Sequence, residues 1–217
     1  MNQTNTIDSA LELAMNTLSL PNILMSHRLI LPGDEHALMP EEIGAFSGSA
    51  VIVRRASGAA RIAARELLTR LGHNGCALPK ASSGVAIWPA GIVGSLSHDC
   101  RVAIAAAAAR RDIVGLGIDV EPAESLPADL LGIVTTPQER RRIRKDPYRG
   151  RLLFAAKEAV YKAVYPLDQT FLEHHDIHID LADCKAIVSN GRAVELRFCA
   201  ASHIVALAFV PAPTKPS

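Results

Sequence analysis

Residues 113–122 place two carboxylates at the end of an apolar run, and this stretch limits the fold more than any other part of the chain. On a β-strand, side chains two positions apart project from the same face, so Asp119 and Glu121 should stand side by side. Two such carboxylates repel each other unless a cation lies between them, one takes up a proton, or both face water. The pair is therefore a candidate site for a hard cation, with a solvated strand end as the alternative.

Residues 154–163 have apolar side chains at helical spacing. On a helix, Glu158 and Lys162 lie four positions apart on one face, and Lys157 and Tyr161 form a similar pair beside them. Glu–Lys pairs at this spacing are most often surface ion pairs that stabilise a helix by about 0.2–0.5 kcal/mol. Considered together with the acidic strand, the helix offers a third carboxylate and an amine to the same site.

A glycine-rich block, Trp-Pro-Ala-Gly-Ile-Val-Gly-Ser-Leu-Ser-His, precedes both stretches at residues 88–98. The three blocks in this order resemble the signature of the 4'-phosphopantetheinyl transferase superfamily, which has W-P-x-G-x-x-G-S-L/I-S/T-H, G-I/V-D-I/V/A-E and F/W-x-x-K-E-x-x-x-K. The first block is similar in form to the block found in the branch that includes the enterobactin synthetase component D enzymes and relatives of the Sfp type. The resemblance covers the chain from about residue 54 to about residue 181.

The resemblance implies that the N-terminal part binds the phosphates of coenzyme A. Residues 54–71 predict a helix with an apolar stripe, and Arg54 and Arg61 lie on its second, cationic face. A charged face is usually a solvated surface, but arginines at these positions contact the phosphates in similar enzymes, and a planar guanidinium suits phosphate oxygens. The coenzyme A contacts that the resemblance implies are Arg54, Arg61, Lys80, Ser97, His98, Lys157 and Lys162.

The resemblance also implies a reaction, the transfer of the 4'-phosphopantetheine arm of coenzyme A to a serine of an apo acyl or peptidyl carrier protein, with release of 3',5'-ADP. Asp119, Glu121 and Glu158 would hold Mg²⁺ through carboxylate oxygens. Glu158 would be the base for the serine proton, directly or through water, and Lys162 would stabilise charge on the departing phosphate. The carrier could serve siderophore, non-ribosomal peptide, polyketide or fatty-acid synthesis, and the sequence does not distinguish these pathways.

Two other classes of function stay open at this point. A different Mg²⁺-dependent phosphoryl-transfer enzyme could use the same carboxylates, but the chain has no G-x-x-x-x-G-K-S/T loop to hold a nucleotide. A non-catalytic module that binds coenzyme A or a carrier would keep Arg54, Arg61 and Lys80 without needing the acids. The complete acidic set argues against such a module.

The chain has 217 residues with 49% hydrophobic content, so it can bury the core of one large domain or two small ones. The resemblance implies that the fold is α+β. The resemblance implies two pseudo-symmetric halves, each with helices packed on a small antiparallel sheet, and coenzyme A in the cleft between them. We expect an N-terminal extension at 1–19, halves at 20–112 and 113–210, and a tail at 211–217.

Three local patterns make more detailed predictions. A helix is expected over residues 7–18, where apolar residues recur at helical spacing. Residues 102–109 contain five successive alanines that favour a helix by propensity, whereas the resemblance requires a strand there. Asn190-Gly191 predicts a two-residue hairpin turn within an antiparallel C-terminal meander.

Composition indicates which partners and compartments to expect. The formal net charge is +1, so no global field attracts nucleic acid or membrane, and the family default is a monomer. The four cysteines are far apart with no C-x-x-C pair, which argues against a zinc ribbon or a disulfide scaffold. No apolar run approaches membrane-spanning length and the N-terminus lacks a signal-peptide pattern, so we expect a cytoplasmic protein.

Residues 140–145 form the dense basic cluster of the chain. Because carrier proteins are acidic, we expect the cluster to help dock one. Three histidines follow at His174, His175 and His178, but no cysteine or acid at suitable spacing completes a transition-metal site with them.

Overall fold

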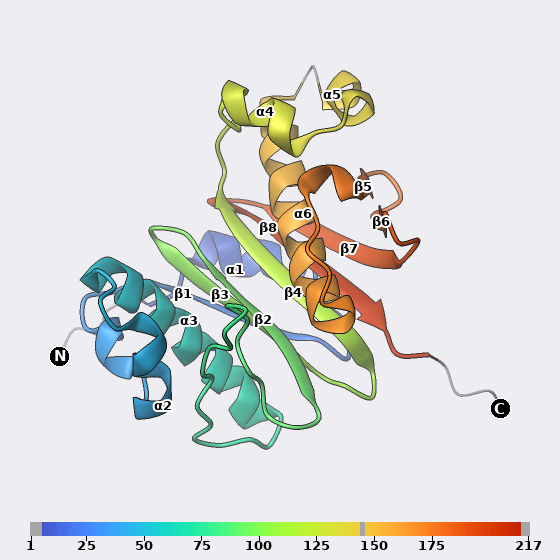
Figure 1. Ribbon diagram of the computed structural model, residues 1–217. Coiled ribbons are helices and arrows are strands. Elements are labelled where there is room, and N and C mark those ends of the chain that lie inside the picture. Colours follow the sequence, from blue (N-terminus) through green and yellow to red (C-terminus); the bar gives the residue numbers. More distant parts are fainter. Residues whose placement is uncertain (1–5, 144–145, 214–217) are drawn as a thin grey trace.

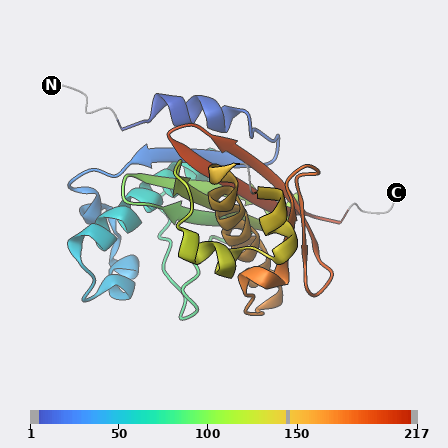
Figure 2. The same cartoon turned by 90° about the horizontal axis from the view of Figure 1, so that it is seen from above.

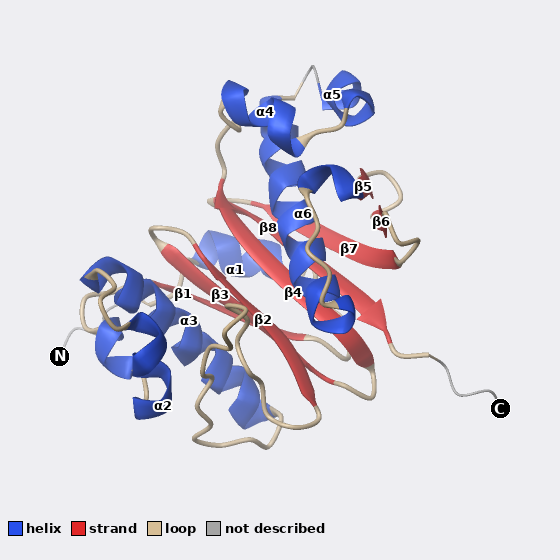
Figure 3. Ribbon diagram, viewed as in Figure 1, coloured by secondary structure: helices blue, strands red, loops and turns tan. Residues whose placement is uncertain are grey.

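The protein, seen in a computed structural model that describes residues 6–143 and 146–213, contains two antiparallel sheets, each covered by one long helix (Figures 1 and 3). The smaller sheet has the strand order β1-β3-β2 and the larger one β4-β8-β7-β6-β5. The strands are β1 (Leu24–Leu29), β2 (Ile92–His98), β3 (Val102–Ala109), β4 (Ile113–Pro122), β5 (Ile177–Asp180), β6 (Lys185–Val188), β7 (Ala193–Ala200) and β8 (His203–Pro211). The helices are α1 (Ser9–Asn16), α2 (Pro40–Ile43), α3 (Val51–Arg70), α4 (Ala128–Val134), α5 (Pro137–Ile143) and α6 (Pro147–Asp168), with short 3₁₀ turns at η1 (Asp34–Ala37), η2 (Gly44–Phe46) and η3 (His174–Asp176). This architecture confirms the expected α+β class.

The two sheets meet at a seam where β4 packs against β2 and β3. The backbone N–H of Ile118 on β4 donates to Ser95 Oγ on β2 at 3.0 Å, which ties the sheets together. On the face opposite to α6, α1 closes the seam, with Leu11 and Met15 buried in one apolar cluster with both sheets (Figure 2). The helix predicted near the N-terminus is therefore part of the core.

Strand β3 shows why the alanine-rich stretch is not a helix. Its alternate residues face two different partners, since Ala105 and Ala107 pack under α3, while Ala106 and Ala108 face the seam. All four are fully buried. A strand buried on both faces has no polar alternation, and tertiary packing here overrides the helical propensity of alanine. The strand that the resemblance requires is confirmed.

Two glycines let α6 cross β4 at very short range. A Cβ added to Gly117 would lie 1.9 Å from the carbonyl oxygen of Ala159 on α6, and one added to Gly115 would lie 2.6 Å from the carbonyl oxygen of Ala163. Close packing against α6 therefore explains why the acidic block has a glycine at position 117. It brings the helix that carries Glu158 and Lys162 close to the strand that carries the acids.

Gly117→Ala should therefore lower the free energy of unfolding by about 3 kcal/mol, the upper end for overpacking, because its methyl group would meet rigid helix backbone. Urea unfolding followed by circular dichroism measures the change. Gly132→Ala on α4 is the matched control, since its nearest atom would be the end of the Arg140 side chain at 3.9 Å. Equal stability of the two variants would show that the close crossing is not required.

The remaining local predictions are close to the structure. The hairpin between β6 and β7 is confirmed, but its loop has three residues, 189–191, instead of the expected two. The backbone N–H of Val188 donates to the carbonyl oxygen of Arg192, and that of Gly191, at φ +85°, donates to the carbonyl oxygen of Val188. The helix expected at 54–71 is α3, and the signature helix runs on through Pro166 to Asp168. No helix among the described residues is both long and apolar enough to cross a bilayer.

Candidate active site

Asp119 and Glu121 both face α6 from β4, as their two-residue spacing predicts. Asp119 Oδ1 accepts a hydrogen bond from Lys162 Nζ at 2.7 Å, and Glu121 Oε2 accepts one from Arg151 Nη1 at 2.8 Å. Both cations come from α6. Each acid therefore has a cationic partner on the helix that crosses the strand.

Asp119 is the more enclosed of the two acids, with 4% of its surface exposed. Its Oδ1 accepts a second hydrogen bond, from Ser97 Oγ at 2.7 Å. Its Oδ2 is buried and has no hydrogen-bond partner within the described part of the chain. A buried carboxylate oxygen without a partner is costly, so this atom has capacity for one more donor or a cation.

Glu121 is partly buried beside Asp119, and its pKa reflects this position. Burial raises the pKa of Glu121 above its ordinary value, and the negative charge of Asp119 raises it further, while Arg151 partly offsets both effects. A cation bound near the two acids would favour the ionised form.

Lys162 connects the two sheets. In addition to Asp119, its ammonium donates to Ser97 Oγ on β2 at 3.1 Å and to the carbonyl oxygen of Ile118 on β4 at 3.3 Å. The amine of the signature helix is thus held at the seam, between the glycine-rich block and the acidic strand.

A cavity of about 480 Å³ opens at this seam. It gathers residues from α3, β2, the loop between them, and α6. Six predicted site residues line it, namely Arg61, Lys80, Ser97, His98, Glu158 and Lys162. Aromatic and small residues complete the wall, among them Phe46, Trp88, Gly94, Tyr161 and Tyr165.

Arg61 forms a buried cationic part of the cavity wall. Its Nε donates to the carbonyl oxygen of Leu78 at 3.1 Å, and its guanidinium lies 5.0 Å from the centre of the Phe46 ring. Lys80 Nζ lies 5.8 Å from the centre of the same ring, and its side chain is exposed. Glu42 lies 3.6 Å from Arg61, so that cation is partly neutralised.

His98 ends β2 at the mouth of the cavity. Although its side chain is exposed to the cavity, desolvation by the surrounding protein lowers the pKa of His98, and the positive charge of Lys162 adds to this effect. The imidazole is therefore neutral near pH 7 and can donate one hydrogen bond.

Two family models match adjacent parts of the chain. The 4'-phosphopantetheinyl transferase N-terminal domain matches residues 42–108, and the 4'-phosphopantetheinyl transferase superfamily matches residues 115–208. The first match contains α3 and the glycine-rich block, and the second contains the acidic strand and α6. The boundary between them lies at the start of β4.

Individual relatives agree with the family models. The 4'-phosphopantetheinyl transferase Npt of Nocardia iowensis is 36% identical over 179 residues, which are 80% of this chain and 75% of that protein. The chain belongs to the 4'-phosphopantetheinyl transferase superfamily. PptT of Mycobacterium tuberculosis is 38% identical over 65% of this chain and 64% of its own length, and Svp of Streptomyces mobaraensis is 40% identical over 63% and 58%. The matched part is thus less than two thirds of the last two relatives.

A solved structure gives a more distant similarity to this phosphopantetheinyl transferase. The holo-[acyl-carrier-protein] synthase of Thermotoga maritima matches 45% of this chain and 62% of its own chain, at 23% identity and a TM-score of 0.36. This similarity is too low to add to the assignment.

The transferase structure places two predicted coenzyme A contacts away from the cavity. Arg54 is half-buried near the start of α3, where its Nη1 donates to the carbonyl oxygen of Ser49. Lys157 is 1% exposed and faces away from the seam cavity. Its ammonium donates to Glu139 Oε2 at 2.8 Å and to the carbonyl oxygens of Val134 at 2.8 Å and His174 at 2.9 Å. In this geometry Lys157 is a buried residue of the α6 packing and does not line the seam cavity.

The three predicted metal ligands of the transferase are not gathered into one cluster. Among the described ranges, no group of three or more His, Cys, Asp or Glu side chains is close enough to hold a metal ion. Glu158 turns toward His174, whose Nε2 lies 3.2 Å from Glu158 Oε1. Asp119 and Glu121 pair with Lys162 and Arg151 instead.

Sequence reasoning missed Arg151 as part of this site. Its spacing from Glu158 and Lys162, at i, i+7 and i+11, places all three on one face of α6, and this signal could have identified it.

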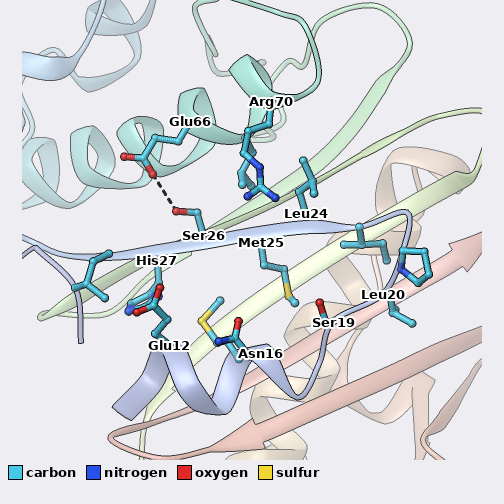
Figure 4. Close-up of a pocket in the computed structure, with 15 residues that line it drawn as sticks. Glu12, Asn16, Ser19, Leu20, Leu24, Met25, Ser26, His27, Glu66 and Arg70 are labelled. Carbon is cyan, nitrogen blue, oxygen red and sulfur yellow. Dashed lines mark hydrogen bonds between the residues drawn. The ribbon is translucent and has the colours of Figure 1, made fainter. Parts of the chain in front are cut away.

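Another cavity of the transferase, about 800 Å³, lies between α1, β1 and the end of α3. Figure 4 shows Glu12 and Asn16 on one side and Glu66 and Arg70 on the other, with Ser26 Oγ donating to Glu66 Oε2 at 3.0 Å. No predicted site residue lines this cavity.

Proposed function

We propose that the chain transfers the 4'-phosphopantetheine arm of coenzyme A to a serine of an apo acyl or peptidyl carrier protein and releases 3',5'-ADP. The strongest support is the seam cavity, because it joins cationic and hydroxyl side chains of one half to a carboxylate and an amine on α6. Membership in the 4'-phosphopantetheinyl transferase superfamily supports the same reaction.

The N-terminal wall suits the phosphates of coenzyme A. Arg61 and Lys80 supply positive charge, and His98 supplies a donor at the end of β2. Ser97 would donate to a phosphate oxygen by turning its hydroxyl away from Asp119. Guanidinium, ammonium and hydroxyl groups are the usual partners of phosphate oxygens. Arg54 belongs to this proposal only if its side chain leaves Ser49 when coenzyme A binds.

Mg²⁺ is the proposed metal, with Asp119, Glu121 and Glu158 as its ligands. The unpartnered Oδ2 of Asp119 and the raised pKa of Glu121 both fit an additional cation at the acids. Carboxylate oxygens are the ligands that Mg²⁺ prefers, and the bound ion would neutralise charge on the pyrophosphate. Glu158 would contribute Oε2, the carboxylate oxygen that does not face His174.

The protein groups handle the proton and the charge of the transfer. The serine oxygen of the carrier forms a bond to the phosphorus that bears pantetheine, and the bond from that phosphorus to the departing 3',5'-ADP oxygen breaks. The carboxylate of Glu158 takes the serine proton, and its position in the cavity wall gives it access. Lys162, already held at the seam, stabilises the charge that develops on the leaving phosphate.

The surroundings of the site are consistent with a carrier as acceptor. Arg141 and Arg142 on α5 are exposed, and Arg142 lies 3.7 Å from Asp180, whereas residues 144–145 of the cluster lie outside the described part. We include in the proposal that the exposed arginines help dock an acidic carrier, that the protein is a monomer, and that it acts in the cytoplasm.

Intact mass spectrometry of an apo carrier tests the reaction directly. After incubation of the purified protein with coenzyme A, Mg²⁺ and carrier, the carrier should gain the mass of one phosphopantetheine, and EDTA should prevent the gain. A panel of acyl, aryl and peptidyl carriers identifies the pathway class. No gain with any carrier, while calorimetry still detects coenzyme A binding, would instead identify a binding module.

A further inference from the structure

His174 lies against the proposed catalytic base from outside the signature blocks. It begins η3, and its Nε2 is 3.2 Å from Glu158 Oε1. This nitrogen is buried, and it makes no aligned hydrogen bond with any described residue. Glu158 is the carboxylate beside it, so a small rotation of that carboxylate would satisfy the nitrogen.

Residues of helix α6 hold both the imidazole ring and the backbone of His174. The ring of Phe154 stacks on the imidazole with centroids 5.6 Å apart and an interplanar angle of 24°. The ammonium of Lys157 holds the carbonyl oxygen of His174 at 2.9 Å. These contacts come from positions i, i+3 and i+4 of α6, which are Phe154, Lys157 and Glu158. Neighbouring positions of one helix therefore hold the imidazole ring, hold the backbone of His174 and present the carboxylate that faces the ring.

Glu158 stands between two cavities. Together with Tyr161 it lines the seam cavity, and the same two residues also line a second cavity of about 640 Å³ that contains His174. The imidazole therefore approaches the carboxylate from the side opposite to the coenzyme A wall. A donor on that side restrains one carboxylate oxygen and leaves the other to the reacting groups.

We infer that His174 is a positioning residue for Glu158, and this inference rests on the proposed function. Its ring nitrogen holds Oε1, so that Oε2 faces the reacting groups in one orientation. Outer partners of this kind commonly change activity by about 10- to 100-fold through the group they orient. The buried Lys157 serves the same end, because it fixes the backbone from which the ring extends.

Steady-state kinetics of two matched pairs of variants tests the inference. His174→Phe keeps a ring that can stack on Phe154 but removes the nitrogen, and it should lower kcat about tenfold with the KM values for coenzyme A and carrier unchanged. His174→Gln places a nitrogen at similar reach and should recover most of kcat. His174→Met is the length-matched variant without a donor, and it should behave like His174→Phe. His178→Phe on β5, an exposed histidine, should match the wild type.

The outcomes separate this inference from the proposed function. A wild-type protein that modifies no carrier would refute the function itself. If the wild type is active, two results would refute the positioning role alone. One is an unchanged kcat in His174→Phe. The other is an equal loss of kcat in His174→Gln and His174→Met when these two variants have the same melting temperature. If His174→Phe does not fold, the Gln and Met pair decides the question, since these side chains differ mainly in the donor.

Discussion

Glu158→Gln should lower kcat for carrier modification by about 10²- to 10⁴-fold, the range expected when a general base is lost. The amide is nearly isosteric with the carboxylate but cannot take the serine proton, and it is a weaker ligand for Mg²⁺. The side chain is partly exposed in the cavity wall, so the fold should be unchanged. The rate of mass gain by the apo carrier, measured at saturating coenzyme A, gives the loss.

Glu173→Gln provides the matched control, because Glu173 is an exposed acid just before η3. It should keep the wild-type rate. Thermal unfolding of both variants shows whether a loss of activity reflects the site or the fold. Full activity in Glu158→Gln would contradict the assignment of the base, and the search for it would then move to the acids of β4.

Lys157→Met should lower the free energy of unfolding by about 3–5 kcal/mol, because removal of one member of a buried ion pair leaves an uncompensated charge. The pair with Glu139 is almost completely enclosed, with side-chain exposures of 0% and 3%. For a domain of this size the melting temperature should fall by roughly 10 °C. The loss should be larger than that of any surface lysine, for which Lys185→Met on β6 is the control.

Glu139 explains why the loss should be so large. Its carboxylate also accepts hydrogen bonds from the backbone N–H groups of Thr136 at 2.8 Å and Ile179 at 3.2 Å, so one buried acid joins α5 to β5 and α6. Burial alone would raise the pKa of Glu139, but the hydrogen bond from Lys157, with those from the backbone, lowers it below its ordinary value. The stabilisation is thus present above the unfolded pKa of a glutamate and is lost as the pH falls through the lowered value.

The double variant Lys157→Met, Glu139→Gln distinguishes charge from packing. It removes the orphaned charge, so it should regain part of the stability lost by Lys157→Met alone. Urea unfolding of the four proteins completes the cycle. A loss below about 1 kcal/mol in Lys157→Met would mean that Glu139 takes up a proton or reaches water, which would contradict a structural role for the lysine.

Features that depend on local periodicity could be predicted from the sequence. Asp119 and Glu121 face the same way because alternation is a property of any strand, and Glu158 and Lys162 line the same cavity because of their helical spacing. The burial of Lys157 could not be predicted, because a motif does not tell which side of a helix meets solvent. Adjacent residues of a helix point about 100° apart, so the ammonium of Lys157 meets Glu139 on α5 while Glu158 faces the cavity.

Partners that depend on tertiary packing could not be predicted in this way. Arg151 meets Glu121 only because the glycines of β4 let α6 cross closely, and nothing local indicates that pairing. His174 was considered only as a metal ligand, since its contact with Glu158 requires η3 to return over α6. The resemblance supplied the strand at β3, where propensity alone favoured a helix.

The alanines of β3 act as a spacer between α3 and the second sheet. The face of the strand toward α3 carries the methyl groups of Ala103, Ala105 and Ala107, so the thickness of that layer sets how far the wall that bears Arg61 stands from the wall that bears Lys162. The width of the cleft is thus determined by side-chain volume in a strand that contacts no reacting group. Substitution of these alanines by slightly larger residues would change the width of the cleft and therefore which pantetheine donors fit. No catalytic residue would have to change.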